Sequence, residues 1–184
     1  MTRTDQQKIR GPGVLGRLSP QLLKTPLAYI LADHRRQRAL FDLCDDLADA
    51  LAYEPTIAKE VADFIADAMS LHVQDEEEDL FPLLRLRALD EDKIEPTIGL
   101  LRGDHAADQT FASQIERDLR TCVARNCETL EQPLRNALRT FADRQRRHLA
   151  IENAIVLPLA QRRLTASDLE CLGNRMAARR GIAL

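Results

Sequence analysis

The four histidines of the chain all belong to one repeated pattern, and their types and spacing suit metal chemistry. They are His34, His72, His105 and His148. Two of them open the same motif, His-x3-Glu-x5-Pro-Leu, in which Glu76 follows His72 and Glu152 follows His148. The other two end the matching segments Leu31-Ala-Asp33-His34 and Leu101-Arg-Gly-Asp104-His105. The order His, His-x3-Glu, His, His-x3-Glu indicates an internal duplication.

The segments that carry these histidines have the apolar periodicity of helices. We expect four long helices over residues 26–53, 57–83, 98–122 and 134–159, separated by polar or proline-containing breaks. Short connections between them predict an all-α protein, an up-down-up-down four-helix bundle. A flexible N-terminal arm (residues 1–19) would precede the bundle (residues 20–160), and a short C-terminal fifth helix and tail (residues 161–184) would follow it. Thr165 and Asp168 indicate the start of the fifth helix.

The spacing of the histidines from prolines predicts that all four lie at one level of the bundle. Each is eight to ten residues from a proline expected near the same end, in the pairs Pro26–His34, Pro82–His72, Pro96–His105 and Pro158–His148. At about 1.5 Å per residue, each imidazole is roughly 12–15 Å from that end. Each also shares a helix face with apolar residues, such as Ile30 for His34 and Ile155 for His148. Four buried imidazoles are costly unless something satisfies them, and a metal ion would do so.

Two glutamates complete the expected site. Residues i and i+4 share a helix face, so Glu76 stands one turn from His72 and Glu152 one turn from His148. Glu152 is an isolated acid in an apolar stretch, where an ionised carboxylate needs a cation. Glu76 belongs to the acidic run 75–79, and the heptad phase selects it as the inward member. Taken alone, each histidine fits an ordinary core residue and the acidic run fits a solvated face, but the joint repeat favours a metal site.

The donor set indicates which metals are suitable. Imidazole and carboxylate without thiolate suit Fe, Mn or Zn. Four histidines and two glutamates exceed what one tetrahedral zinc ion needs, but they suit two ions bridged by the carboxylates. Each ion would have two nitrogen and two oxygen ligands, with positions left for water, hydroxide or a small diatomic molecule. Ferritin-like sites use Glu-x-x-His, and the reversed order here disfavours that class.

The composition is that of an ordinary globular protein, with 45% hydrophobic, 30% charged and 4% aromatic residues. Few aromatic and β-branched residues favour helix and argue against a β-sandwich or barrel. The net charge of −3 gives no reason to expect nucleic acid as a partner, and no apolar stretch reaches the about 18 residues of a membrane span. The four cysteines lack zinc-finger or redox spacing, and no export signal is apparent, so we expect reduced thiols in a cytoplasmic protein.

The motif order, with Leu or Phe before each proline, resembles the hemerythrin-like (HHE cation-binding) family over residues 20–160, and residues 176–181 resemble its bacterial members. The resemblance implies a four-helix bundle with a non-haem di-iron centre that binds or senses oxygen or related oxidants. By motif position, the metal ligands would be His34, His72, Glu76, His105, His148 and Glu152, with the two glutamates as bridges.

Two positions depart from the oxygen-carrying hemerythrins. Those proteins have a fifth histidine where this chain has Gln109, and an aspartate where it has Asn153 and uses Glu152 instead. A lost nitrogen ligand leaves an iron more open to water, which argues against reversible oxygen carriage. Gln109, Asp108 and Glu77 are the candidates for a compensating ligand or for a second sphere around the metals.

The leading hypothesis is a metal-binding protein with two non-haem iron ions, with Zn or Mn as alternatives, that binds or senses O2, NO or peroxide. We expect the ligand to enter near the first and third helices, in a pocket lined by Ile30, Leu101 and Phe141. No residue resembles a nucleophile or an anchor for an organic substrate, so a metabolic enzyme is disfavoured and no catalytic residue is assigned.

Two alternatives remain open. One is a di-iron redox enzyme of the ferroxidase, peroxidase or NO-reducing type. The other is a metal-responsive signalling or interaction module that binds a protein partner or a second copy of the chain. A basic tail would serve that partner or would cap the bundle, and it consists of Arg162, Arg163, Arg175, Arg179 and Arg180.

Overall fold

The computed structural model describes residue 13 and residues 15–184. All regular elements in that part of the chain are helices, with no strand among them, which agrees with the all-α prediction. None of these helices is both long and apolar enough to cross a membrane. Most of the predicted flexible arm, residues 1–12 and 14, lies outside the described residues.

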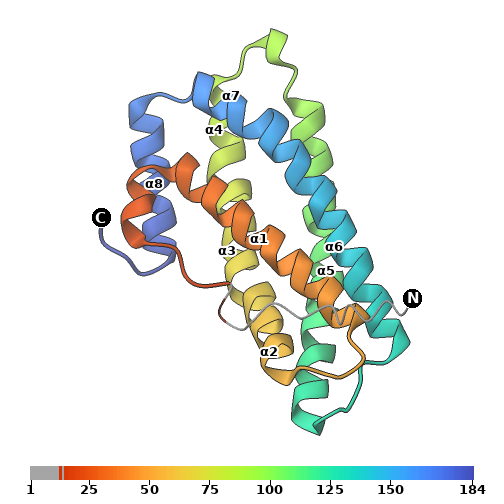
Figure 1. The fold of residues 1–184 in the computed structure, drawn as a ribbon. Helices are drawn as coiled ribbons and strands as arrows, with labels where there is room; N and C mark the ends of the chain where they lie inside the picture. Colours follow the sequence, from red (N-terminus) through yellow and green to blue (C-terminus); the bar gives the residue numbers. More distant parts are fainter. Residues whose placement is uncertain (1–12, 14) are drawn as a thin grey trace, which may run out of the picture.

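Four long helical segments form a bundle (Figure 1). The first is α1 (Pro26–Asp49), and the third is α5 (Glu95–Arg125). The second consists of α2 (Pro55–Phe64), η2 (Ile65–Met69), α3 (Ser70–Asp75), η3 (Glu76–Leu80) and α4 (Phe81–Arg87), and the short η4 (Asp90–Asp92) follows it. The fourth consists of α6 (Gln132–Ile151), η5 (Glu152–Val156) and α7 (Leu157–Arg163). Both α1 and α5 pack against α2 and α6, so the four segments enclose a common core.

Proline begins each of the four segments. Pro26, Pro55, Pro96 and Pro133 occupy the first or second helical position. A proline fits there because the first amides of a helix have no intrahelical acceptor and because its fixed φ is already helical. The third segment ends at Asn126, whose φ of 49° is a left-handed conformation that asparagine tolerates.

Two π-helical turns begin at the expected metal-binding glutamates. They are η3 and η5, and each is followed two residues later by a proline, Pro82 or Pro158. Proline cannot donate the i→i−4 hydrogen bond, and its ring crowds the carbonyl four residues earlier. A turn with one extra residue relieves that conflict and rotates the helix face by about 100°. Because of this rotation Ile155, which we predicted on the histidine face, is instead 44% exposed.

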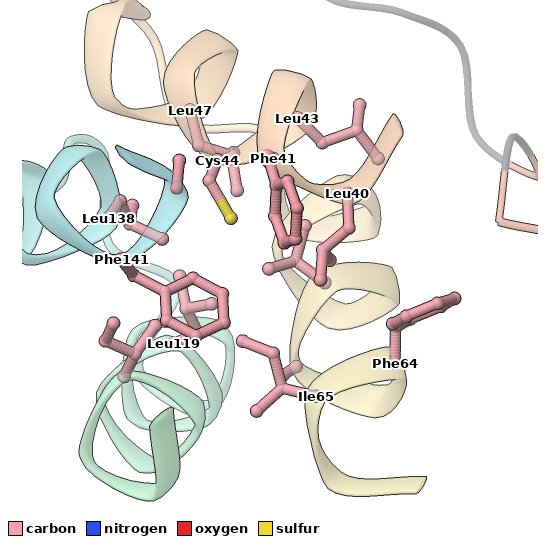
Figure 2. Packing of buried hydrophobic residues seen from close by; sticks show 14 of the residues in the cluster. Leu40, Phe41, Leu43, Cys44, Leu47, Phe64, Ile65, Leu119, Leu138 and Phe141 are labelled. Carbon is pink, nitrogen blue, oxygen red and sulfur yellow. The ribbon is translucent and has the colours of Figure 1, made fainter. Parts of the chain in front are cut away.

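Two apolar clusters lie on either side of the histidine level. The first contains Phe41, Cys44 and Phe141, and the two phenylalanine rings meet edge to face with centroids 6.2 Å apart (Figure 2). The second contains Ile30 and Phe81 together with residues from α5, α7 and α8. Each long segment contributes to both clusters, so the packed core holds the polar layer between them from both sides.

The predicted fifth helix is α8 (Ala166–Arg179), which packs beside α1 and the short η1 (Pro20–Lys24) (Figure 1). Thr165 and Asp168 form a capping box, in which each side chain accepts a hydrogen bond from the backbone amide of the other. Gly173 permits the close approach of α8 and η1, since a Cβ at this position would lie 2.4 Å from the carbonyl oxygen of Leu23.

Candidate metal centre

The structure brings the six predicted residues together in the core. They form two groups whose ligand atoms lie within 4.8 Å of one another: His34, His72, Glu76 and Glu152 in one, and Glu76, His105, His148 and Glu152 in the other. Both glutamates belong to both groups. Because the groups draw on all four long segments, the site depends on the assembled bundle rather than on one helix.

The Nε2 atoms of the four histidines point at the two glutamates. Their distances to a carboxylate oxygen are 3.5 Å from His34 to Glu152, 3.5 Å from His72 to Glu76, 3.4 Å from His105 to Glu76 and 2.7 Å from His148 to Glu152. Apart from the 2.7 Å contact between His148 and Glu152, the glutamate oxygens have no hydrogen-bond partner in the described part of the chain, and neither do Nε2 of His34 and of His72.

These orphaned atoms provide the test of whether a metal fits. Both glutamate side chains have no exposed surface, so water does not satisfy them from outside. A buried polar atom without a partner costs about 1–3 kcal/mol, and more when it is charged. Inward lone pairs and carboxylate oxygens without donors are the ligands that first-row transition metals accept. The residues present therefore fit a bound cation.

The other ring nitrogen of every histidine meets an oxygen acceptor. The Nδ1 contacts are His34 to Asn153 at 3.2 Å, His72 to Asp33 at 3.3 Å, His105 to Glu77 at 2.8 Å and His148 to Asp104 at 3.4 Å. With the proton on Nδ1, each ring donates to its acceptor and presents the Nε2 lone pair to the centre. Metal-binding histidines in proteins are commonly oriented by such a second hydrogen bond.

The four acceptors follow the same duplication as the histidines. Asp33 and Asp104 each precede a histidine in sequence, but each contacts the histidine of a different segment. Glu77 and Asn153 each follow the glutamate of a His-x3-Glu motif. Sequence reasoning did not assign a role to Asp33, Asp104 or Asn153, although the matched Asp-His pairs were a signal that could have identified the two aspartates.

The histidines and glutamates of the cluster shift one another's pKa values. Burial, together with the nearby His72, lowers the pKa of His34 to about 4. Burial would also lower the pKa of His72, but Glu76 and Asp33 outweigh it and raise that pKa to about 10. Burial, followed by the neighbouring Glu76, raises the pKa of Glu152. In the metal-free chain, protons on histidine thus balance the buried carboxylates, and a bound cation would displace them.

The three candidates for a compensating ligand lie outside both groups of ligand atoms. Glu77 contacts Nδ1 of His105 and accepts a hydrogen bond from Arg102, so it lies in the second sphere. Asp108 is buried and pairs with Gln145 and with Arg144. Gln109 is exposed.

A cavity of about 790 Å³ opens onto the centre between the second segment and α5. His72, His105, His148 and Phe141 line it, so the prediction for Phe141 agrees with the structure. The predicted entry beside the third helix also agrees, but the second segment rather than the first supplies most of the opposite wall, and α1 contributes Gln37. Ile30 and Leu101 pack in the second apolar cluster, beyond the histidine level, and do not line this cavity.

The arginines of the basic tail form ion pairs within the chain. Arg179 and Arg180 both contact the buried Asp75, with Nη–Oδ distances of 2.5 and 2.6 Å. Arg175 and Arg179 contact Asp79. Arg162 and Arg163 bind Asp92 on η4. Within the acidic run 75–79, Glu76 therefore belongs to the centre, whereas Asp75 and Asp79 are neutralised by arginines of α8.

The comparison with protein families agrees with this geometry. The model of the hemerythrin HHE cation binding domain matches residues 25–160, which include all four long segments and all six residues of the two groups. No match to the chain is found among curated proteins. The family model covers well over half of the sequence, and the chain therefore belongs to the hemerythrin HHE cation-binding family.

Proposed function

We propose that the protein holds two non-haem iron ions in the core of the bundle. His34 and His72 would bind one ion, His105 and His148 the other, and Glu76 and Glu152 would bridge them. The observation that carries this proposal is that both glutamates are shared between two otherwise separate groups of possible ligands. A dinuclear site needs bridging carboxylates placed in this way, whereas a single ion has no use for two additional histidines.

The donor set also limits the metal. Each ion would have two imidazole nitrogens and two carboxylate oxygens, which suits Fe and also accommodates Mn or Zn. The resemblance to the hemerythrin-like family favours iron among these three metals. Two iron ions held in this way would supply redox chemistry and open coordination positions for O2, NO or peroxide.

We propose that the protein binds or senses such a small ligand rather than carrying oxygen reversibly. The cavity reaches three of the four histidines and provides a path from solvent. Gln109, in the position of a further histidine in oxygen carriers, is exposed and outside both ligand groups. The ion bound by His105 and His148 would then keep more open positions than in a carrier.

A signalling role is the second candidate, because one observation favours it. Asp75, which is adjacent to Glu76, is held by two arginines of α8. A change at the bridging glutamate would therefore be transmitted to the contact between α8 and the bundle. A redox enzyme, by contrast, has no specific support beyond the metal centre itself.

We also propose the up-down-up-down order for the four segments, since the connections between them are short. The division into an arm (1–19), a bundle (20–160) and a tail (161–184) is part of the same proposal. The four cysteines are free thiols, which suits a reducing cytoplasm.

The test is the metal content per chain of protein produced with iron, together with its optical spectrum before and after reduction and exposure to air. We expect two irons per chain and charge-transfer bands that disappear on reduction and return in air. Glu152→Ala should abolish both, while Glu170→Ala, at an exposed position on α8, should leave both unchanged. A well-folded helical protein without metal would overturn the proposal, and bands that do not return would favour one-way redox chemistry.

A further inference from the structure

The cavity beside the metal centre is much larger than a diatomic ligand requires. Its volume is about 790 Å³, whereas one water molecule takes about 30 Å³ in the liquid. Pockets for small organic molecules measure roughly 300–1,000 Å³. Its size alone therefore matches an organic occupant, and its inner end lies at His72, His105 and His148.

The wall combines an apolar surface with two buried amides. The large apolar residues of its lining include Ile65, Met69 and Phe141. Gln37 and Gln145, which are only 1% and 7% exposed, also line the cavity. Each amide donates one hydrogen bond to an aspartate, Gln37 to Asp33 at 3.4 Å and Gln145 to Asp108 at 2.8 Å. Each amide oxygen is then left as an acceptor for a group inside the cavity.

Apart from the three histidines of the centre, the acidic and basic side chains of the wall are paired with neighbours of opposite charge. Arg102 binds Glu77 at 2.7 Å. Asp108 binds Arg144 at 2.7 Å. Glu116 binds Arg120. A charged ligand would find no uncompensated counter-ion among these side chains, and burying it would carry a desolvation cost.

We propose that this cavity binds an uncharged, largely apolar organic molecule that carries a hydroxyl or N–H group. The apolar wall holds the body of the molecule, and a buried glutamine oxygen accepts its polar hydrogen. The binding surface belongs to the protein itself, whereas the position of the molecule beside a metal centre rests on the proposed function. This substrate class extends the proposed site from diatomic ligands to organic ones.

The experiment uses a matched pair of fluorescent probes. N-phenyl-1-naphthylamine is uncharged, apolar and carries one N–H group, and 8-anilinonaphthalene-1-sulfonate has the same skeleton with an anionic group. Titrations are made on metal-free and on zinc-loaded protein, because zinc neither quenches the probe nor changes oxidation state. We expect one neutral probe per chain, bound at least about tenfold more tightly than the sulfonate, or about 1.4 kcal/mol.

A matched pair of variants locates the binding. Ala106 and its neighbour Ala107 are both exposed, but of the two Ala106 lines the cavity and Ala107 does not. Ala106→Trp should therefore weaken the neutral probe by about tenfold or more by filling the space, and Ala107→Trp should change its affinity by less than about twofold. Equal effects of the two variants, or tighter binding of the sulfonate, would overturn the proposal.

Metal content separates this inference from the proposed function. Both tryptophan variants should hold as much metal as the wild-type chain, since neither position belongs to the ligand groups. If the chain binds the probe in the cavity at Ala106 but takes up no metal, the cavity assignment is supported and the di-iron proposal is wrong. Two irons per chain without probe binding would leave the di-iron proposal standing and defeat the cavity assignment.

Discussion

Asp33 is next to His34 in sequence, but its carboxylate contacts His72 on α3, with 3.3 Å between Oδ2 and Nδ1. The aspartate is 3% exposed and also binds Arg36 and Gln37. Burial would raise its pKa, but His72, together with Arg36 and Gln37, outweighs burial and the pKa is lowered. Asp33 is therefore a charged, fixed support that sets the tautomer and orientation of a histidine on another helix.

Removal of this support should weaken metal binding without removing a ligand. Asp33→Ala is expected to lower metal affinity about 10–100-fold, whereas Asp33→Asn, which keeps an acceptor, should lower it less. Competition with a chromophoric chelator measures the affinity. Asp67→Ala, at an exposed position on η2, is the control. If Asp33→Ala and Asp67→Ala bound metal equally well, Asp33 would have no positioning role.

The symmetry of the site is broken at one pair of equivalent positions. Glu77 puts a carboxylate on Nδ1 of His105, whereas Asn153 puts a neutral amide on Nδ1 of His34. Glu77→Gln keeps an acceptor but removes the charge, and we expect it to weaken metal binding at the His105 side by up to about tenfold. A stepwise metal titration should show the change in one of two steps, and Glu78→Gln, at its exposed neighbour, should show none. An equal change in both steps would contradict this assignment.

Glu76 and Glu152, the proposed bridging ligands, should destabilise the fold when no metal is present. Glu152 is fully buried beside Glu76, and burial followed by that neighbour raises its pKa. Glu152→Gln removes the repulsion and should leave the metal-free chain at least as stable as the wild type. A site filled at 1,000 times its Kd adds about 4 kcal/mol, and the variant should lose most of that gain. Thermal unfolding with and without metal measures both effects, and a variant less stable than wild type without metal would refute the argument.

The six residues that the structure brings together could be predicted from the sequence, because their pairing within each segment depends on local geometry. A glutamate four residues after a histidine shares its helix face whatever the rest of the fold does. The partners of the Nδ1 atoms could not be predicted in this way. Asp33 and Asp104 contact histidines on other segments, and these contacts depend on how the helices are rotated against each other. The exposure of Ile155 was missed because a π-turn changes the helix phase, while the sequence pattern fits a regular helix equally well.

The cavity and the role of the tail were beyond sequence reasoning for a similar reason. The position of the cavity depends on the spacing between the second segment and α5, which no motif encodes. The acidic run also contains three buried members, and periodicity selected Glu76 but gave no partner for Asp75 or Asp79. Those partners are arginines of the C-terminal helix and the residue after it, about a hundred residues later in the chain: Arg179 and Arg180 for Asp75, and Arg175 and Arg179 for Asp79.

The two kinds of arginine contact on α8 should differ in their contribution to stability. Arg180 makes a short contact with Asp75, hydrogen bonds to Tyr29 and stacks over its ring at 5.0 Å. Loss of one partner of a buried ion pair costs about 3–5 kcal/mol of stability. Because Arg179 still pairs with Asp75, the loss of stability in Arg180→Ala should lie at or below the lower end of that range. Arg175 is 57% exposed, so Arg175→Ala should cost less than about 1 kcal/mol. Urea unfolding compares the two, and similar losses would contradict the distinction.

The start of α8 provides a test in which the sign of the pH dependence is fixed. Asp168 accepts hydrogen bonds from Thr165 and binds Arg87 with two contacts of 2.8 and 2.9 Å. The Arg87 contacts, followed by those from Thr165, lower the pKa of Asp168 from its ordinary value of 3.8. A lowered pKa gives a stabilisation that is fully present above pH 3.8 and is lost as the pH falls from there through the lower folded-state value.

Asp168→Ala should therefore lower the free energy of unfolding at pH 7 by about 0.5–2 kcal/mol, the range for loss of a helix-capping side chain. Asp168→Asn keeps a capping acceptor but loses the charge toward Arg87, so it should be intermediate. Ser167→Ala, at the exposed neighbouring position, is the control and should be close to wild type. Urea unfolding at pH 7 and below pH 3.8 measures the difference in the free energy of unfolding between wild type and Asp168→Asn. That difference should shrink as the carboxylate is protonated, because the variant has no charge to lose, and a difference that grew at acid pH would show that the Arg87 contact does not stabilise α8.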